Sequence, residues 1–171
     1  MQSLLNLKIK FRESFRPFAP SVLLERTKEC FDFEGESQYM LFTAPVRNEI
    51  RLALPEDRKT LKGTHRINEI RSTIPVVTHV DYSARLQTVK RSDNPLFYDL
   101  ILNFYELTGC PVIVNTSFNV RGEPIVCTPL DAYRCFMRTN MDYLVLENFV
   151  LDKKAQPSGH DYSWKQEFEP D

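Results

Sequence analysis

The stretch from Cys110 to Pro129, CPVIVNTSFNVRGEPIVCTP, constrains the fold of this chain more than any other. It begins with the short β-branched run 111–114, which is typical of a buried strand. A polar cluster follows, which consists of Asn115, Thr116, Ser117, Asn119 and Arg121. A rigid strand that ends in a polar loop is a common way to build an anion or nucleotide site. Asn, Ser and Gly also form ordinary turns, so residue types alone leave a polar turn between core strands equally open.

A helix is predicted immediately before this stretch. Asn94 can cap it, Pro95 can occupy its first position, and Gly109 can end it in a left-handed conformation. Its apolar residues recur at helical spacing, and we expect them all to pack in the core: Leu96, Phe97, Leu100, Ile101, Phe104 and Leu107.

After the stretch, the Thr128-Pro129 pair predicts a helix to about residue 140, close to a capping box. We expect its inward residues to be Ala132, Phe136 and Met137. A strand over 143–151 should follow.

The order of elements predicts an α/β fold. Before the central stretch we expect a short helix over 21–34, with Ser21 as its cap. We also expect strands over 8–12, 38–42, 75–80 and 84–89. Strands and helices therefore alternate, which indicates a twisted mixed sheet with flanking helices. We take residues 1–151 as one domain and residues 152–171 as a polar tail.

Composition limits the possible partners. The net charge is −1, so no global field favours nucleic acid or an acidic membrane, and an anion site must be a local cluster of Arg and Lys. No apolar run is long enough to span a membrane. The four cysteines form no CxxC pair and the three histidines are scattered, which does not match a structural zinc site. We expect reduced thiols in a cytoplasmic protein.

Basic residues alternate with apolar ones over residues 8–12. In a strand this pattern would place Lys8, Lys10 and Arg12 on one face. Such a face suits phosphate, but an edge strand with a solvated basic face has the same pattern.

A second group of polar residues lies around the predicted turn 81–83. Thr78 and His79 precede the turn, and Arg85 follows it in the next strand. A single His in a strand is more often a core residue than a catalyst, so Arg85 is the better candidate. The polar segment 55–71 is long for a loop, and it is predicted either to cover a nucleotide or to be a plain surface loop.

Three long runs carry a family resemblance. The run NTSFNVRGEPIVCTP resembles the C-terminal part of O-carbamoyltransferases, the enzymes that decorate antibiotics and nodulation factors. IKFRESFRPFAPSVL (residues 9–23) and PVVTHVDYSARLQTV (residues 75–89) agree with it in the family's order. Residues 116–124 are also similar to the Thr-Ser-x-Asn…Gly-x-Pro loop of threonylcarbamoyl-AMP synthases, which implies a YrdC-like fold.

The resemblance implies that the chain binds ATP and carbamoyl phosphate and forms carbamoyl-adenylate, whose carbamoyl group then passes to a hydroxyl acceptor. It implies phosphate neutralisation by Lys10, Arg12 and Arg85. The residues implied in nucleotide or carbamoyl phosphate binding are Thr78, His79, Ser117, Asn119 and Arg121. Mg²⁺ is expected with ATP, and because phosphates supply much of its shell we assign no metal ligands.

Members of this family are much longer, and their N-terminal domain carries the acceptor site. The resemblance therefore implies an N-terminal acceptor-binding domain as the partner for complete transfer. Two alternatives remain open, a threonylcarbamoyl-AMP synthase-like enzyme and a non-catalytic nucleotide-binding module. The runs THVD, ARLQTV and FRPFAP belong to the transferases and favour them over the synthases.

Overall fold

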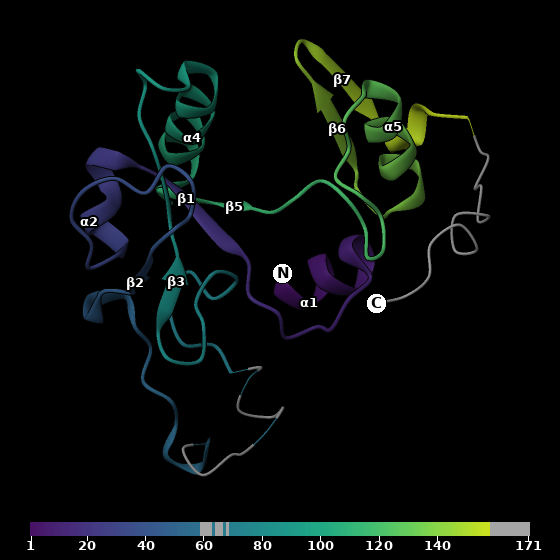
Figure 1. The fold of residues 1–171 in the computed structure, drawn as a ribbon. Helices are drawn as coiled ribbons and strands as arrows, with labels where there is room; N and C mark the ends of the chain where they lie inside the picture. The colour runs from purple at the N-terminus through teal and green to yellow at the C-terminus, as the bar shows by residue number, and fades with distance from the viewer. Residues whose placement is uncertain (59–62, 64–66, 68, 158–171) are drawn as a thin grey trace. The chain divides into compact units, whose positions relative to one another are not determined.

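The computed structural model describes residues 1–58, 63, 67 and 69–157. The chain forms two compact units (Figure 1). The N-terminal segment Met1–Arg16 joins the segment that begins at Ser117 in one unit, which we call the terminal unit. Pro17–Thr116 forms the other, which we call the central unit.

The central unit is built on a three-stranded mixed sheet. Its middle strand β1 (Ala19–Leu23) runs parallel to β4 (Gln87–Val89) and antiparallel to β5 (Val112–Asn115). Helix α4 (Pro95–Thr108) packs on this sheet through a core of Leu23, Val89 and Ile101, with Phe97, Tyr98, Leu102 and Ile113 packed against it. A mixed sheet with a packed helix confirms the predicted α/β class.

Shorter elements complete the central unit. Strands β2 (Thr43–Pro45) and β3 (Ser83–Arg85) form an antiparallel pair. The remaining elements are helical turns, namely Leu24–Arg26, α2 (Thr27–Cys30), Asn48–Ile50 and Glu56–Arg58.

Helix α4 has the predicted ends. Asn94 Oδ1 accepts a hydrogen bond from Phe97 N at 3.1 Å, Pro95 is the first helical residue, and Gly109 has φ of 71°. The predicted core stripe was wrong for most of its residues, because only Ile101 is buried. Phe97, Tyr98 and Leu102 of the same helix are partly buried against this core. The remaining residues of the predicted stripe are exposed: Leu96, Leu100, Phe104 and Leu107.

In the terminal unit, α1 (Gln2–Leu5) continues into a π-helical turn over Asn6–Lys10. Helix α5 (Pro129–Arg138) is followed by the hairpin of β6 (Tyr143–Leu146) and β7 (Phe149–Asp152) and by a short turn over Lys153–Ala155. A small core of Val120 and Cys135 is covered by Phe11, Phe118, Val126 and Met141.

The start of α5 confirms its prediction. Thr128 Oγ1 accepts from Asp131 N at 3.1 Å, and Asp131 Oδ2 accepts from Thr128 N at 3.0 Å, which is a complete capping box. Ala132 and Phe136 are buried as expected, and Met137 is partly buried.

The prediction of a strand over residues 8–12 was wrong. The backbone is helical up to Lys10, and Phe11 has the left-handed φ of 49°. A left-handed residue other than Gly is strained, and its surroundings must hold it in place. Here the Phe11 ring packs on the core around Val120 and Cys135.

The predicted helix over 21–34 was wrong in its bounds, because residues 21–23 belong to strand β1 and only residues 24–30 are helical. Ser21 lies in β1, where its hydroxyl donates to Gln87 Oε1 of the neighbouring strand at 2.6 Å instead of capping a helix. Only Thr27–Cys30 is α-helical, because Val22 and Leu23 are needed in the sheet core, where each is fully buried.

Three further strand boundaries differ from prediction. Residues 38–42 precede strand β2 instead of forming it, and residues 75–80 form turns. The predicted strand 143–151 is a hairpin that reverses at Glu147, which has φ of 51°. The segment 84–89 is confirmed as extended, but β3 and β4 pair with different partners.

Two regions fall partly or wholly outside the described residues. The predicted nucleotide-covering loop includes residues 59–62, 64–66 and 68, and the predicted tail includes residues 158–171. Along the described part of the chain, no helix has the length and apolar character that crossing a membrane requires.

Candidate functional site

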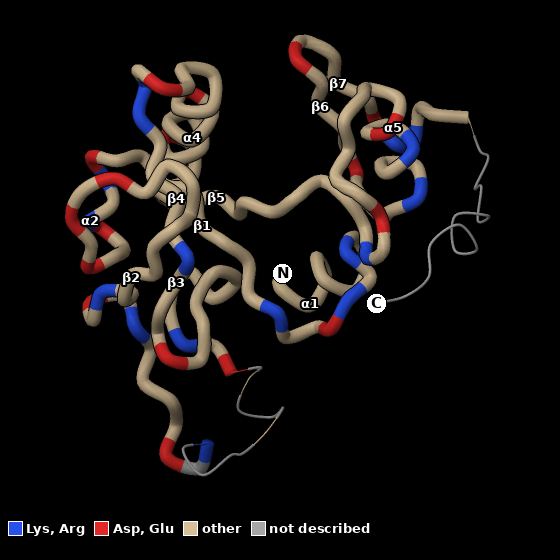
Figure 2. Tube along the Cα trace, viewed as in Figure 1, with Lys and Arg blue, Asp and Glu red and all other residues tan. Residues whose placement is uncertain are grey.

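A cavity of about 470 Å³ lies within the terminal unit. Four cationic side chains line it, those of Lys10, Arg12, Arg16 and Arg121. The loop over residues 117–124 provides the rest of the wall, including one carboxylate, Glu123. Figure 2 marks the Lys and Arg residues of this unit in blue. We call this cavity the basic pocket.

Lys10 organises the loop wall of the basic pocket. The π-helical turn ends at Lys10, and its side chain is almost fully buried. Its Nζ donates to the carbonyl oxygens of Ser117 at 2.7 Å and Asn119 at 2.6 Å. It also contacts Asn119 Oδ1 at 2.7 Å and Ser117 Oγ at 3.3 Å. Since an ammonium group has only three hydrogens, these four oxygens engage all of them.

Burial of the ammonium group lowers the pKa of Lys10 to about 8, and the positive charge of Arg12 adds to this effect. Cys135 and the negative charge of Glu123 act in the opposite direction and limit the shift of this pKa. Lys10 therefore carries a positive charge at neutral pH, but it loses that charge in a pH range where ordinary lysines keep it.

Ser117 and Asn119 close the loop on itself. The Ser117 hydroxyl donates to Asn119 Oδ1 at 2.7 Å, and Asn119 Nδ2 donates to the carbonyl oxygen of Glu123 at 2.8 Å. Gly122 has φ of 80°, a conformation that glycine adopts without strain. These side chains therefore hold a polar turn, which leads from β5 to α5 instead of joining two core strands as the alternative interpretation had it. The turn is also a wall of the basic pocket.

Arg12 is positioned by Asn6, a residue that was not predicted to belong to the site. Arg12 Nε donates to Asn6 Oδ1 at 2.6 Å. The Asn6 amide donates in turn to the carbonyl oxygens of Arg16 at 2.8 Å and Ser14 at 3.1 Å. Asn6 is fully buried, so residues 12–16 fold back around a fixed amide. Burial, and next the charge of Arg16, lowers the pKa of Arg12, and an arginine still remains charged at neutral pH.

The two outer cations share one exposed carboxylate. Arg121 Nη1 lies 3.6 Å from Glu13 Oε1, and Arg16 Nη1 lies 3.7 Å from Glu13 Oε2. Exposed ion pairs of this length contribute little to stability, so an anionic ligand could replace Glu13 beside these guanidinium groups at small cost. Arg16 was not among the predicted site residues, although it lies in the FRPF part of the first family-like run.

The one carboxylate that lines the basic pocket, that of Glu123, is already paired with a cation. Glu123 Oε1 accepts a hydrogen bond from Arg138 Nη1 at 2.7 Å. The pocket wall therefore presents an excess of positive charge.

The structure gathers five of the eight predicted site residues around the basic pocket: Lys10, Arg12, Ser117, Asn119 and Arg121. The other three belong to the central unit. Thr78 is buried, and its hydroxyl bonds to Ile74 O at 3.0 Å and Ser72 Oγ at 2.7 Å. His79 Nδ1 lies 3.0 Å from Asp81 Oδ1, and Arg85 is exposed on β3.

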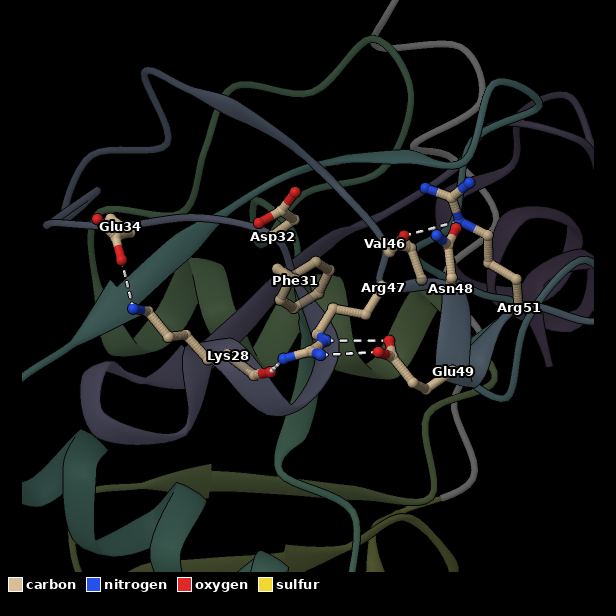
Figure 3. A pocket seen from close by; sticks show the side chains of 9 residues that line it. All are labelled: Lys28, Phe31, Asp32, Glu34, Val46, Arg47, Asn48, Glu49 and Arg51. Atoms are coloured by element: carbon tan, nitrogen blue, oxygen red, sulfur yellow. Dashed lines mark hydrogen bonds and ion pairs between the residues drawn. The ribbon is translucent and has the colours of Figure 1, made fainter.

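A second cavity, of about 420 Å³, lies in the central unit (Figure 3). Its wall carries three cations and three carboxylates, so it has no preference for anions. Arg47 binds Glu49 with two hydrogen bonds, at 3.0 and 2.8 Å, and Lys28 pairs with Glu34. The hydrogen bonds from Arg47 are the main cause that lowers the pKa of Glu49 to about 2.

The residues that the structure describes include no cluster of three His, Cys, Asp or Glu side chains that could hold a metal ion. Four of the five charged side chains that line the basic pocket are cationic, which does not fit a divalent cation.

The sequence matches the family model described as carbamoyltransferase C-terminus over residues 1–153. An uncharacterized protein of Synechocystis sp. is 60% identical over 172 residues, which cover 100% of this chain and 28% of that protein. Nodulation protein NolNO of Sinorhizobium fredii is 39% identical over 93% of this chain and 21% of its own length. Nodulation protein NolO of Bradyrhizobium diazoefficiens is 39% identical over 88% of this chain and 24% of its own length. This chain thus spans between a fifth and a third of the length of these relatives.

Proposed function

Because this chain belongs to the family of carbamoyltransferase C-termini, we propose that it binds ATP and carbamoyl phosphate and forms carbamoyl-adenylate for transfer to a hydroxyl acceptor. The observation that carries the proposal is the basic pocket, in which four cations surround a cavity whose single carboxylate is paired with Arg138.

The charge of the basic pocket suits polyanionic substrates. ATP and carbamoyl phosphate both carry several negative charges, and their reacting groups must be neutralised and held in line. Guanidinium groups match phosphate because each can donate two parallel hydrogen bonds. The net charge of the whole chain is −1, so the local cluster, and not a global field, attracts the anion.

We infer different roles for the cations from their contacts. Arg12, Arg16 and Arg121 line the cavity and are the proposed phosphate ligands. Lys10 is a positioning residue, because its hydrogens already engage the oxygens of Ser117 and Asn119. It also adds a positive charge behind the loop wall. Ser117 and Asn119 thereby hold the loop shape, and the second amide hydrogen of Asn119 is the donor proposed to reach the ligand.

Several parts of the proposal concern groups outside the basic pocket. The roles of Thr78, His79 and Arg85 stay predictions. Mg²⁺ is proposed to arrive with ATP and to take its ligands from the phosphates, where it would offset their charge. The acceptor is proposed to bind to the N-terminal part of a carbamoyltransferase, because the relatives are more than three times longer than this chain.

Calorimetric titration with ATP, followed by an assay of ATP consumption with and without carbamoyl phosphate, tests the proposal. Arg12→Ala should weaken ATP binding by roughly 10- to 100-fold, because a hydrogen bond to a charged group is worth about 1.5–3 kcal/mol. Arg91→Ala is the matched control. Arg91 is exposed and pairs with Asp99 in the central unit, so its loss should leave binding unchanged.

The same assay separates the alternatives. Consumption that requires carbamoyl phosphate supports the proposal. Binding of ATP without any consumption, also when the N-terminal part of a relative is supplied, would favour a non-catalytic nucleotide-binding module. Consumption that depends on threonine in place of carbamoyl phosphate would favour a threonylcarbamoyl-AMP synthase-like enzyme. If a folded chain binds no ATP, the basic pocket is not the nucleotide site.

A further inference from the structure

Helix α4 carries more apolar surface than the core of this chain uses. Its buried side faces the sheet through Ile101, with Phe97, Tyr98 and Leu102 packed around it. Another set of apolar residues on the same helix faces solvent. Leu96 is 84% exposed, Leu107 is 86% exposed, Leu100 is 58% exposed and Phe104 is 38% exposed.

These four exposed residues form one continuous face. At about 100° per residue, positions 96, 100, 104 and 107 fall within an arc of roughly 80°. We call this set the leucine face. None of its members is charged, and the polar side chains of α4 lie elsewhere, with Glu106 about 120° round the helix from the centre of the face.

The extent of the apolar arc is unusual for a helix that covers only one side of a sheet. A surface helix normally has one apolar stripe and an opposite polar face, whereas a helix that is apolar around most of its circumference is buried on several sides. Soluble proteins rarely expose contiguous apolar patches of more than a few hundred Å², and larger ones mark interaction sites. The leucine face thus has the character of a surface that packs against another apolar surface.

The lengths of the relatives indicate which part of a carbamoyltransferase could pack against the leucine face. The family model describes a C-terminus, and the Synechocystis relative matches all of this chain with only 28% of its own length. The greater part of such a protein therefore precedes the matched segment. A body of that size offers enough surface to cover a helix face, and covering it would remove three leucines and a phenylalanine from water.

We propose that the leucine face of α4 is the docking surface for the N-terminal part of a carbamoyltransferase, through an apolar patch without buried charge on that part. The inference rests on the proposed function only for the identity of the partner. It involves neither the basic pocket nor ATP.

Thiol labelling of single-cysteine positions tests this proposal. Leu100→Cys and Leu107→Cys are made in this chain and in a chimera, in which this chain replaces the matching segment of the Synechocystis protein. Glu106→Cys on the polar side of the same helix is the matched control. Mass spectrometry after maleimide treatment assigns each label and distinguishes it from the native Cys127, which is exposed.

The expected result is labelling of positions 100 and 107 at least tenfold slower in the chimera than in the isolated chain, with little change at position 106. Equal rates in the two proteins would overturn the proposal. Slow labelling of positions 100 and 107 in the isolated chain would also overturn the proposal, because the chain's other unit or a second copy of the chain would then cover the leucine face. A labelling rate that depends on protein concentration would identify the second copy.

A measurement without substitutions guards against a chimera that does not fold. Oxidative footprinting compares the equivalent leucines in the intact Synechocystis protein with Leu96, Leu100 and Leu107 in this chain. Protection in the intact protein supports the proposal, and equal oxidation contradicts it. Because neither measurement involves ATP, loss of the proposed function and loss of this docking surface are distinguishable.

Discussion

Arg138 Nη1 donates to Glu123 Oε1 at 2.7 Å, and only 12% and 8% of the two side chains are exposed. The pair joins helix α5 to the loop wall of the basic pocket. Glu123 holds that loop at two further points, because its Oε2 accepts from Val120 N at 3.4 Å and its carbonyl oxygen accepts from Asn119 Nδ2 at 2.8 Å. The shape of the pocket therefore depends on an ion pair that an anionic ligand need not touch.

Arg138→Met should destabilise the chain by about 3–5 kcal/mol, because it leaves the Glu123 carboxylate buried without its partner. Urea unfolding measures this loss. Arg134→Met is the control on the same helix, and since Arg134 is exposed its substitution should cost less than about 0.5 kcal/mol. The double variant Arg138→Met with Glu123→Gln should recover part of the loss. Equal effects of the two single substitutions would contradict a structural role for the pair.

Asn119→Ala should reduce both stability and ATP affinity. The substitution removes one acceptor of the Lys10 ammonium group and of the Ser117 hydroxyl, and it removes the donor to Glu123. Loss of buried hydrogen-bond partners costs about 1–3 kcal/mol. Thermal unfolding and ATP titration on the same samples measure the two effects.

Asn119→Asp separates the two effects. The carboxylate keeps the acceptor for Lys10 and Ser117 but lacks the donor to the Glu123 carbonyl oxygen, so only part of the stability should be retained. The new negative charge in the basic pocket should weaken ATP binding at least as much as Asn119→Ala does. A variant that binds ATP as tightly as the natural chain would show that the anion does not approach this loop.

Helix ends were the most predictable part of the fold. The signals at Asn94, Gly109 and Thr128 act within a few residues of the chain, and each has its predicted place in the structure. Such local geometry depends on backbone groups that the sequence places next to one another.

Predictions of secondary structure failed where tertiary contacts decide the conformation. The alternation over residues 8–12 favours a strand locally, but Lys10 contacts oxygens 107 and 109 residues further along the chain. Ser21 suits a helix cap, yet its neighbours Val22 and Leu23 are required in the sheet. A single sequence does not reveal such long-range contacts.

The residues of the basic pocket could be predicted largely through the resemblance, and their roles could not. Arg12 and Arg121, which the resemblance singled out, line the cavity, and their binding of phosphate stays a prediction. Lys10 was predicted as a phosphate ligand, whereas its hydrogens are used within the loop wall. Asn6 carried no signal at all, because an Asn between leucines resembles an ordinary helix residue until its buried partners are known.

The burial of side chains on α4 predicts different stability losses for three alanine variants, whereas the sequence pattern placed all three residues in the core. Ile101→Ala should cost about 2–5 kcal/mol, because the side chain is fully buried against the sheet. Phe104→Ala should cost less than about 2 kcal/mol, since the ring keeps 38% of its surface in water. Leu107→Ala, at 86% exposed, should be close to neutral. Urea unfolding of the three variants gives the order, and a larger loss for Phe104→Ala than for Ile101→Ala would contradict the packing described above.

Raising the pH through about 8 should weaken ATP binding through Lys10. The pKa of Lys10 is lowered from 10.5 to about 8 in the folded chain, mainly by burial. Above that pH the folded chain loses a positive charge beside the basic pocket, while the phosphates of ATP are already ionised. The neighbouring Cys135 does not offset the change, because burial raises its pKa to about 11 and it stays neutral. We expect roughly a tenfold loss of affinity between pH 7 and pH 9.5, because the phosphates lose the Coulomb attraction of one nearby unit charge.

Loss of the same Lys10 proton should raise the free energy of unfolding, although it weakens ATP binding. Between pH 8 and 10.5 the unfolded chain keeps the Lys10 proton that the folded chain releases, so this group's contribution to the free energy of unfolding rises with pH in that window. Lys10→Arg is the control, because arginine stays charged throughout and should flatten both profiles. ATP titration and urea unfolding at matched pH values measure them. If Lys10→Arg and the natural chain lose ATP affinity in parallel up to pH 9.5, Lys10 is not the titrating group, and its charge plays no part in binding the anion.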